Sequence, residues 1–237
     1  MWLRGKHDLS IVDARDFSAK HIHNFWNFRG ENSNAVAVAL DSQAQKVVGI
    51  GFVEGKSDIQ TIHVYDGRDG VTAFEAADIL EEQVTAWISL EVNLEGDKFF
   101  VGGAKDRDFS RGEAYIAALD FDENADLVSF KKFGPEYGFN CFTSLRRHPD
   151  QDILFGGCFG WLVILAWAGN GFHLINKIKN IVDAPITDVD VKLAKKAVYT
   201  VCEHVQGMAV YFDKGFSQSR DKSRNTTDQR ALPYDYR

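Results

Sequence analysis

A repeated segment is the feature that most constrains how this 237-residue chain can fold. An apolar segment of β-strand composition recurs at intervals of roughly 45–55 residues, a period typical of repeat architectures. Each copy follows a shorter apolar stretch and a polar turn, which is the pattern of two antiparallel strands joined by a hairpin. The four copies are KVVGIGF from Lys46, KFFVGGA from Lys98, DILFGGC from Asp152 and KAVYTVC from Lys196.

A third strand follows each copy and ends in an apolar residue that is usually followed by aspartate. A fifth such ending, Leu9–Asp13, lies upstream of the first full copy. Because two strands align in register at once, we interpret the repeat as genuine. The endings in the four full copies are Tyr65-Asp66, Leu119-Asp120, Trp167-Ala168 and Phe212-Asp213.

A turn and a fourth strand are predicted after each third strand except the last. One of these strands is ambiguous, because Phe74, Ala77 and Leu80 also fit the spacing of a helix. We predict a strand there because the equivalent segment at 127–133 alternates apolar and polar residues. The four predicted strands are Ala19–Trp26, Val71–Ile79, Leu127–Phe133 and Phe172–Ile178.

Four-stranded units with an apolar-Asp pair closing the third strand resemble the WD-repeat β-propeller family. The resemblance covers roughly residues 9–216 and includes the His148-Pro149-Asp150-Gln151 turn and the paired glycines 102–103 and 156–157. No Gly-His pair precedes any first strand, and Ala168 follows the one tryptophan in a signature position, Trp167. The resemblance implies an all-β propeller of four-stranded antiparallel blades that serves as a protein-interaction scaffold.

About four blades are visible, and the strand count favours an incomplete ring. The chain begins with the last strands of one blade and ends with a three-stranded blade. The alternative is a closed four-bladed ring in which Ala19–Trp26 completes the final blade. The predicted units are a partial blade at 1–33, blades at 34–80, 81–137, 138–180 and 181–216, and a disordered tail at 217–237.

Composition narrows the classes of function. The net charge of −7 argues against a surface built to neutralise nucleic acid or anionic lipid. Three cysteines lie in apolar runs without metal-ligand spacing, so we expect buried, reduced thiols and an intracellular protein, cytoplasmic or nuclear. No apolar run is long enough to span a membrane, and the N-terminus lacks the hydrophobic stretch of a signal peptide. The cysteines are Cys141, Cys158 and Cys202.

Three pairs of residues could carry chemistry, and each has a simpler structural interpretation. His21 and His23 share one face of a strand but lack a third metal ligand at fixed spacing. Asp188 and Asp190 would project toward a central channel as paired carboxylates. Cys202 and His204 would share a strand face without an orienting third group. We therefore predict no catalytic residue, no metal and no cofactor.

Loop residues with aromatic or guanidinium side chains are the candidates for contact with other proteins, because such residues dominate interface energetics. For the aromatic residues, packing between blades is the alternative. We expect protein or peptide partners in a multiprotein assembly. The other hypothesis is a ligand-binding or hydrolytic propeller with polar residues converging on its channel. The candidate residues are Trp26, Arg29, Arg107, Arg111, Tyr137, Phe139 and Arg146.

Overall fold

The computed structural model describes residues 8–43, 45–68, 70–79, 86–105, 112–180, 184–192, 197–202 and 207–211. Within these ranges the chain forms eighteen strands, one short α-helix and one 3-10 turn. The all-β prediction is therefore confirmed. Predicted features that lie outside the described residues are Arg107, Arg111, His204, the Phe212-Asp213 pair and the tail at 217–237.

Two complete four-stranded antiparallel sheets occupy the middle of the chain. The first is β8 (Ala86–Val92), β9 (Lys98–Ala104), β10 (Ala114–Asp120) and β11 (Leu127–Phe133). The second is β12 (Ser144–Arg147), β13 (Ile153–Cys158), β14 (Trp161–Trp167) and β15 (Phe172–Lys179). In both sheets the strands lie in sequence order, as the repeat predicts.

The preceding sheet has five strands instead of the expected four. It contains β3 (Asn27–Phe28), β4 (Glu31–Leu40), β5 (Val47–Val53), β6 (Gln60–Tyr65) and β7 (Thr72–Glu75). A tight turn at Arg29 and Gly30, both with positive φ, folds β3 back onto β4. The predicted boundary between residues 33 and 34 is wrong, since it falls inside β4. The strand predicted at 71–79 is correct only up to Glu75, because α1 (Ala76–Ile79) follows.

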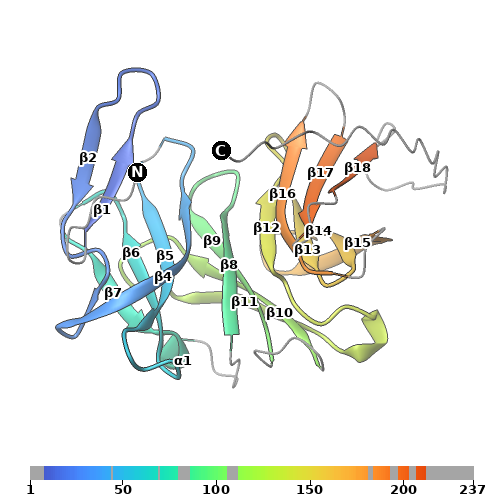
Figure 1. Ribbon diagram of the computed structural model, residues 1–237, viewed down its shortest axis with the longest axis horizontal. Helices are drawn as coiled ribbons and strands as arrows, with labels where there is room; N and C mark the ends of the chain where they lie inside the picture. Colours follow the sequence, from blue (N-terminus) through green and yellow to red (C-terminus); the bar gives the residue numbers. More distant parts are fainter. Residues whose placement is uncertain are drawn as a thin grey trace, which may run out of the picture.

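The two remaining sheets are smaller and lie at the two ends of an arc of sheets (Figure 1). One pairs β1 (Leu9–Val12) with β2 (Ala19–Ile22), and the other contains β16 (Ile186–Lys192), β17 (Ala197–Cys202) and β18 (Gly207–Tyr211). The alternative in which Ala19–Trp26 completes the last sheet is wrong, because β2 pairs with β1. The strand predicted there also ends early, at Ile22, before a turn.

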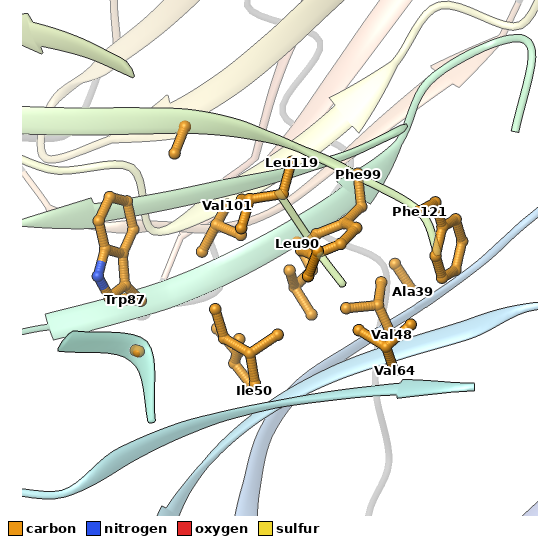
Figure 2. Packing of buried hydrophobic residues seen from close by; sticks show 14 of the residues in the cluster. Ala39, Val48, Ile50, Val64, Trp87, Leu90, Phe99, Val101, Leu119 and Phe121 are labelled. Carbon is orange, nitrogen blue, oxygen red and sulfur yellow. The ribbon is translucent and has the colours of Figure 1, made fainter. Parts of the chain in front are cut away.

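The first strands of successive sheets pack against one another, β4 against β8, β8 against β12 and β12 against β16. Between the sheets lie apolar cores, of which Figure 2 shows the one between β4–β7 and β8–β11. There Ile50 and Val64 face Trp87, Leu90 and Phe99 across the gap between the sheets. Trp87 is 1% exposed on β8, which confirms the prediction that it is a core residue on a first strand.

Glycines in the second strands permit this close stacking. A Cβ at Gly102 would lie 2.5 Å from the Ser89 hydroxyl and 2.8 Å from Phe142 Cβ. A Cβ at Gly157 would lie 2.9 Å from the Ile186 carbonyl oxygen of the next sheet. Only a residue without a side chain fits at such a close approach of backbones.

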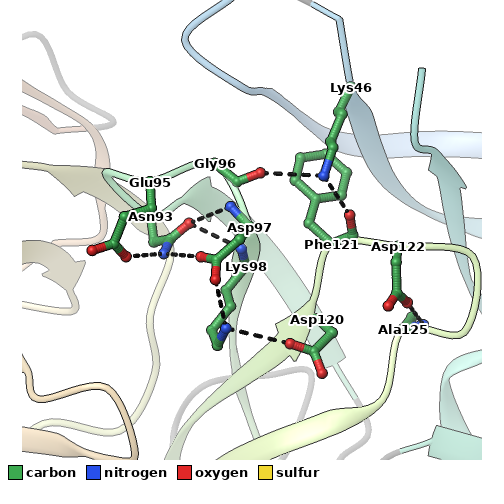
Figure 3. A network of polar contacts seen from close by, with 10 residues as sticks. All are labelled: Lys46, Asn93, Glu95, Gly96, Asp97, Lys98, Asp120, Phe121, Asp122 and Ala125. Atoms are coloured by element: carbon green, nitrogen blue, oxygen red, sulfur yellow. Dashed lines mark hydrogen bonds and ion pairs between the residues drawn. The ribbon is translucent and has the colours of Figure 1, made fainter.

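Polar contacts join neighbouring sheets at the edge where first strands turn into second strands (Figure 3). Lys46 donates to the carbonyl oxygens of Phe121 at 2.9 Å and Gly96 at 3.5 Å. The signature residue Asp120 lies 3.4 Å from Lys98 Nζ, where Lys98 opens the paired second strand. In this copy of the repeat, the lysine that opens the second strand and the aspartate that closes the third strand therefore form an ion pair within one sheet. In the described part of the chain, no helix has the length and apolar character needed to cross a membrane.

Candidate functional site

Antiparallel order brings two kinds of connection to the same edge of each sheet. In the sheet β8–β11, Ala114 at the start of the third strand pairs with Ala104 at the end of the second strand and with Phe133 at the end of the fourth. The turn between second and third strands and the connection to the next sheet therefore lie at the same edge. We call this edge the inter-sheet edge. It carries the turn at Arg29 and the connection 134–143, which includes Tyr137 and Phe139. The topology therefore gathers candidates that lie far apart in the sequence.

A pocket of about 260 Å³ opens on the inter-sheet edge between the sheets β8–β11 and β12–β15. It lies beside the 3-10 turn η1 (Pro135–Tyr137), which ends at Gly138 with φ 75°. The described lining is aromatic and small, with no carboxylate, imidazole or thiol among its members. The described lining is therefore uncharged and presents polar as well as apolar surface. The residues are Gly112, Pro135, Gly138, Phe139, Asn140, Phe159 and Trp161.

Phe139 belongs to the wall of this pocket and to the core, because only 2% of it is exposed. Its ring lies 5.3 Å from that of Phe133 and 5.8 Å from that of Phe142. Trp26 is also buried, with its ring 5.2 Å from that of His63. For both residues the structure shows packing, so neither is an exposed anchor. Tyr137 stays half-buried at the surface.

Phe159 is the exposed aromatic residue beside the pocket, and the sequence interpretation missed it. It is 38% exposed in the two-residue turn between β13 and β14. A bridge to Pro185 holds the turn from one side. Gly160 receives a hydrogen bond from Asn180 N–H and donates one to the Ala184 carbonyl, at 2.8 and 3.0 Å. The backbone that carries the ring is thus ordered before any partner arrives, which lowers the entropic cost of binding. The sequence signal for this site is a Phe-Gly pair where other repeats place polar residues.

A lysine lies at the rim of the same pocket. Lys177 Nζ lies 4.7 Å from the centre of the Trp161 ring and donates a hydrogen bond to the Tyr137 carbonyl oxygen. Among the ion pairs of the described residues, none includes Lys177. The rim therefore combines aromatic surface with a positive charge that no carboxylate in the described chain neutralises.

The two described arginine candidates have different surroundings. Arg29 extends from its turn with 70% of its side chain exposed, and it lies 3.9 Å from Glu75 and 3.8 Å from Asp78. Arg146 lies on β12, where its Nε donates to the Val189 carbonyl oxygen at 3.1 Å. Its guanidinium is also 3.9 Å from Glu91 on β8. Arg146 therefore links three first strands, while Arg29 stays exposed on the inter-sheet edge.

The acidic residues of the first strands have local partners, and Glu91 and Asp190 also lie near the guanidinium of Arg146. Asp190 pairs with Lys192 at 2.5 Å, and this contact lowers the pKa of Asp190. Asp188 accepts from the N–H of Val189 at 2.8 Å. Burial raises the pKa of Glu91, although its carboxylate accepts from the Arg147 N–H at 3.1 Å. Each of these acids therefore has a partner within the described chain.

The remaining chemical candidates are in structural environments. His21, on the exposed strand pair β1–β2, lies 2.9 Å from the Ser10 hydroxyl, and His23, in the turn after β2, lies 3.3 Å from Asp8. Among the described residues there is no group of three or more His, Cys, Asp or Glu placed to hold a metal ion. The cysteines are buried and free, as predicted. Burial raises the pKa of Cys141 to about 11, so this thiol is not activated as a nucleophile.

Comparison with known proteins identifies the architecture. No protein-family model matches the sequence, and no curated protein matches it either. Solved structures do match. The Cps50 (Swd1) β-propeller domain of Myceliophteria thermophila gives a TM-score of 0.57 at 12% identity, over 90% of this chain and 63% of that one.

Two further structures give similar values. Hydrazine synthase of Kuenenia stuttgartiensis has a TM-score of 0.60 at 8% identity, over 87% of this chain and 65% of that one. Sqt1 of Chaetomium thermophilum has a TM-score of 0.55 at 15% identity, over 81% of this chain and 48% of that one. The chain thus spans less than two thirds of each of these three structures. The fold is a β-propeller architecture of four-stranded antiparallel blades. At these identities the likeness concerns the fold alone.

Proposed function

We propose that this chain is a protein-interaction scaffold that docks a protein or peptide partner on its inter-sheet edge, as a subunit of a larger assembly. One observation carries the proposal. Phe159 is exposed on a turn whose backbone is bonded to neighbouring segments, beside a pocket whose rim bears Trp161 and Lys177. An exposed aromatic ring on an ordered turn, next to a preformed uncharged pocket, is an arrangement found at interface hot spots.

The proposal is non-enzymatic, and two observations support this. The described lining of the pocket offers no acid, base or nucleophile. The acids on the first strands each bind a local partner. The Swd1 propeller domain has the same architecture, whereas hydrazine synthase shows that the architecture also occurs in an enzyme. The three free, buried cysteines support an intracellular location, either cytoplasmic or nuclear.

Peptide selection tests the docking site even though the partner is unidentified. The immobilised chain is used to select from a random peptide library, and the affinities of the enriched peptides are measured by calorimetry. We expect Phe159→Ala to weaken binding at least tenfold, which corresponds to about 1.4 kcal/mol. The matched control is Phe17→Ala, because Phe17 is 79% exposed in the turn between β1 and β2, on the opposite edge.

Thermal melts of both variants should match the wild-type melt, since both rings are exposed. Equal loss of affinity in the two variants, or the absence of any enriched peptide, would exclude the inter-sheet edge as the docking site.

A further inference from the structure

An apolar stripe on β4 lies exposed on one face of its sheet. Val38 and Leu40 are each 42% exposed, and Val36, at an irregularity in the strand, is 40% exposed. Side chains alternate between the faces of a strand, so Ala39 points the other way, into the core shared with β8. The stripe therefore lies on the face that is turned away from the sheet β8–β11.

Comparison with β8 shows that no first strand of the described residues lies over this face. Both are first strands, and β8 is buried at every residue except Ile88. In β4 only Ser33 and Ala39 are buried. The strand β8 packs between β4 and β12, whereas β4 packs, within the described chain, against the single first strand β8. The exposed surface of β4 thus depends on which strands pack beside it.

The outer part of the same face is covered. Val47 on β5 packs in a cluster with Leu9, Ile11 and Ile22 of the sheet β1–β2. A Cβ at Gly49 would lie 2.6 Å from the Trp26 ring. The covering layer thus reaches β5 and β6 and stops short of β4. The boundary between buried and exposed surface runs between β5 and β4, which are paired at Val38–Gly49 and Leu40–Val47.

The sheet β1–β2 shows what a complete covering layer would contain. Strand β1 ends just before Asp13, the position that marks third strands in the repeat. The third strands β6, β10 and β14 each pair with a fourth strand and with a second strand. Within the described residues β1 pairs with β2 alone. In the repeat, the other edge of β1 is where a second strand would pair. A first strand paired to that second strand would then lie over β4.

We propose that the open edge of β1 and the stripe of Val36, Val38 and Leu40 form a docking surface for a two-stranded β-segment of a partner polypeptide. One strand pairs with β1 by main-chain hydrogen bonds, and the other places alternate apolar side chains on β4. The segment resembles in chemistry the hairpins formed by the first and second strands of this chain. This surface is separate from the inter-sheet edge, so the proposal does not depend on the proposed function.

The probe is the chain's own hairpin of residues 86–104, carried on a soluble carrier protein. In its native place the face bearing Phe100 packs on the next sheet, in a cluster with Leu145. If the hairpin occupies the equivalent position beside the sheet β3–β7, the face that bears Phe100 lies on β4. The control is the same carrier with Phe100→Lys in the hairpin, which removes the apolar contact and keeps the strand length.

The readout is the rate of thiol labelling in the Leu40→Cys variant of the full chain. The native cysteines Cys141, Cys158 and Cys202 are buried, so the introduced thiol reacts first. We expect a saturating concentration of the carrier hairpin to slow this labelling at least tenfold, and the Phe100→Lys hairpin to leave it unchanged. A Phe17→Cys variant, labelled at a site 79% exposed in the wild type, should be unaffected by either hairpin.

An unchanged labelling rate with the hairpin present would overturn the proposal. Protection at position 40 that rises with the concentration of the chain alone would also overturn it, because a second copy of the chain would then be the occupant.

Discussion

The sheets β3–β7 and β8–β11 contain copies of the same repeat, yet they differ in how deeply their first strands are buried. Their second strands have similar sequences, VVGIGFV and KFFVGGA, and both strands are largely buried. Their first strands diverge, since β8 is almost wholly buried and β4 is mostly exposed. In a stack of sheets, burial is therefore a property of the neighbours as well as of the strand itself.

The largest effect in this comparison is expected at the centre of the buried layer. Trp87→Ala should lower the free energy of unfolding by about 3–5 kcal/mol, because a large aromatic side chain leaves a cavity that its neighbours cannot fill. Denaturant unfolding followed by circular dichroism measures the change. Trp161→Ala is the control, since Trp161 is only half-buried at the pocket. If both variants lost the same stability, the contrast between core and edge would be wrong.

The close stacking of the central sheets can be tested at two glycines. Gly102→Val and Gly157→Val should each destabilise the protein by about 3 kcal/mol, because branched side chains would meet atoms already within 3 Å of the new Cβ. Gly171→Ala provides the comparison, since its nearest neighbour, Ser129 Oγ, lies 4.0 Å away. Wild-type melts for the valine variants would remove the argument for close packing between these sheets.

His63 tests whether the outer part of the exposed face is closed by Phe25 and Trp26. Burial lowers the pKa of His63 to about 4, against an ordinary value of 6.5. The unfolded chain binds a proton below pH 6.5 while the folded protein does not, so stability should fall as the pH drops from 6.5 toward 4. The expected loss is of the order of 2–3 kcal/mol.

The comparison of wild type with His63→Gln isolates this effect from other histidines, including His148, whose pKa burial also lowers. Unfolding free energies measured at pH 7 and pH 4.5 should differ less in the variant. A His63 that titrates near pH 6.5 in the folded protein would show that this half of the face is open as well.

The smallest effect is expected on the exposed stripe. Leu40→Ala should cost less than about 1 kcal/mol, because the side chain is already 42% exposed. Leu90→Ala on β8, where the leucine is 7% exposed, should cost about 2–5 kcal/mol. Equal costs for the two leucines in denaturant unfolding would mean that β4 is covered in solution.

Local pattern accounts for most of the strands that were predicted. The alternation at 127–133 and the apolar runs after Lys98 and Asp152 become β11, β9 and β13 with nearly the expected bounds. The segment 71–79 was predicted only in part, because its residues are compatible with both strand and helix and the chain changes from β7 to α1 at Ala76. Pairing partners are non-local, so spacing alone left two partners open for Ala19–Trp26, the strand before it or the last blade, and the structure pairs β2 with β1.

The candidate site was predicted less completely. Tyr137 and Phe139 were identified as loop aromatics, but only packing shows that Phe139 belongs to the core. Phe159 and Lys177 were missed because their roles depend on residues distant in sequence, Pro185 for the turn and Tyr137 for the lysine. A single strand or turn does not carry this information.

By itself, the sequence determined the repeat, the all-β class, the buried cysteines and Trp87 as a core residue, because strand propensity and two-residue alternation are local properties of the chain. Only the tertiary structure decided which faces of these strands are covered, which aromatic ring remains exposed and which lysine lies outside the ion pairs of the described residues. The reason is physical: burial and electrostatic pairing depend on which segments lie side by side in space, and in stacked sheets those segments come from different repeats.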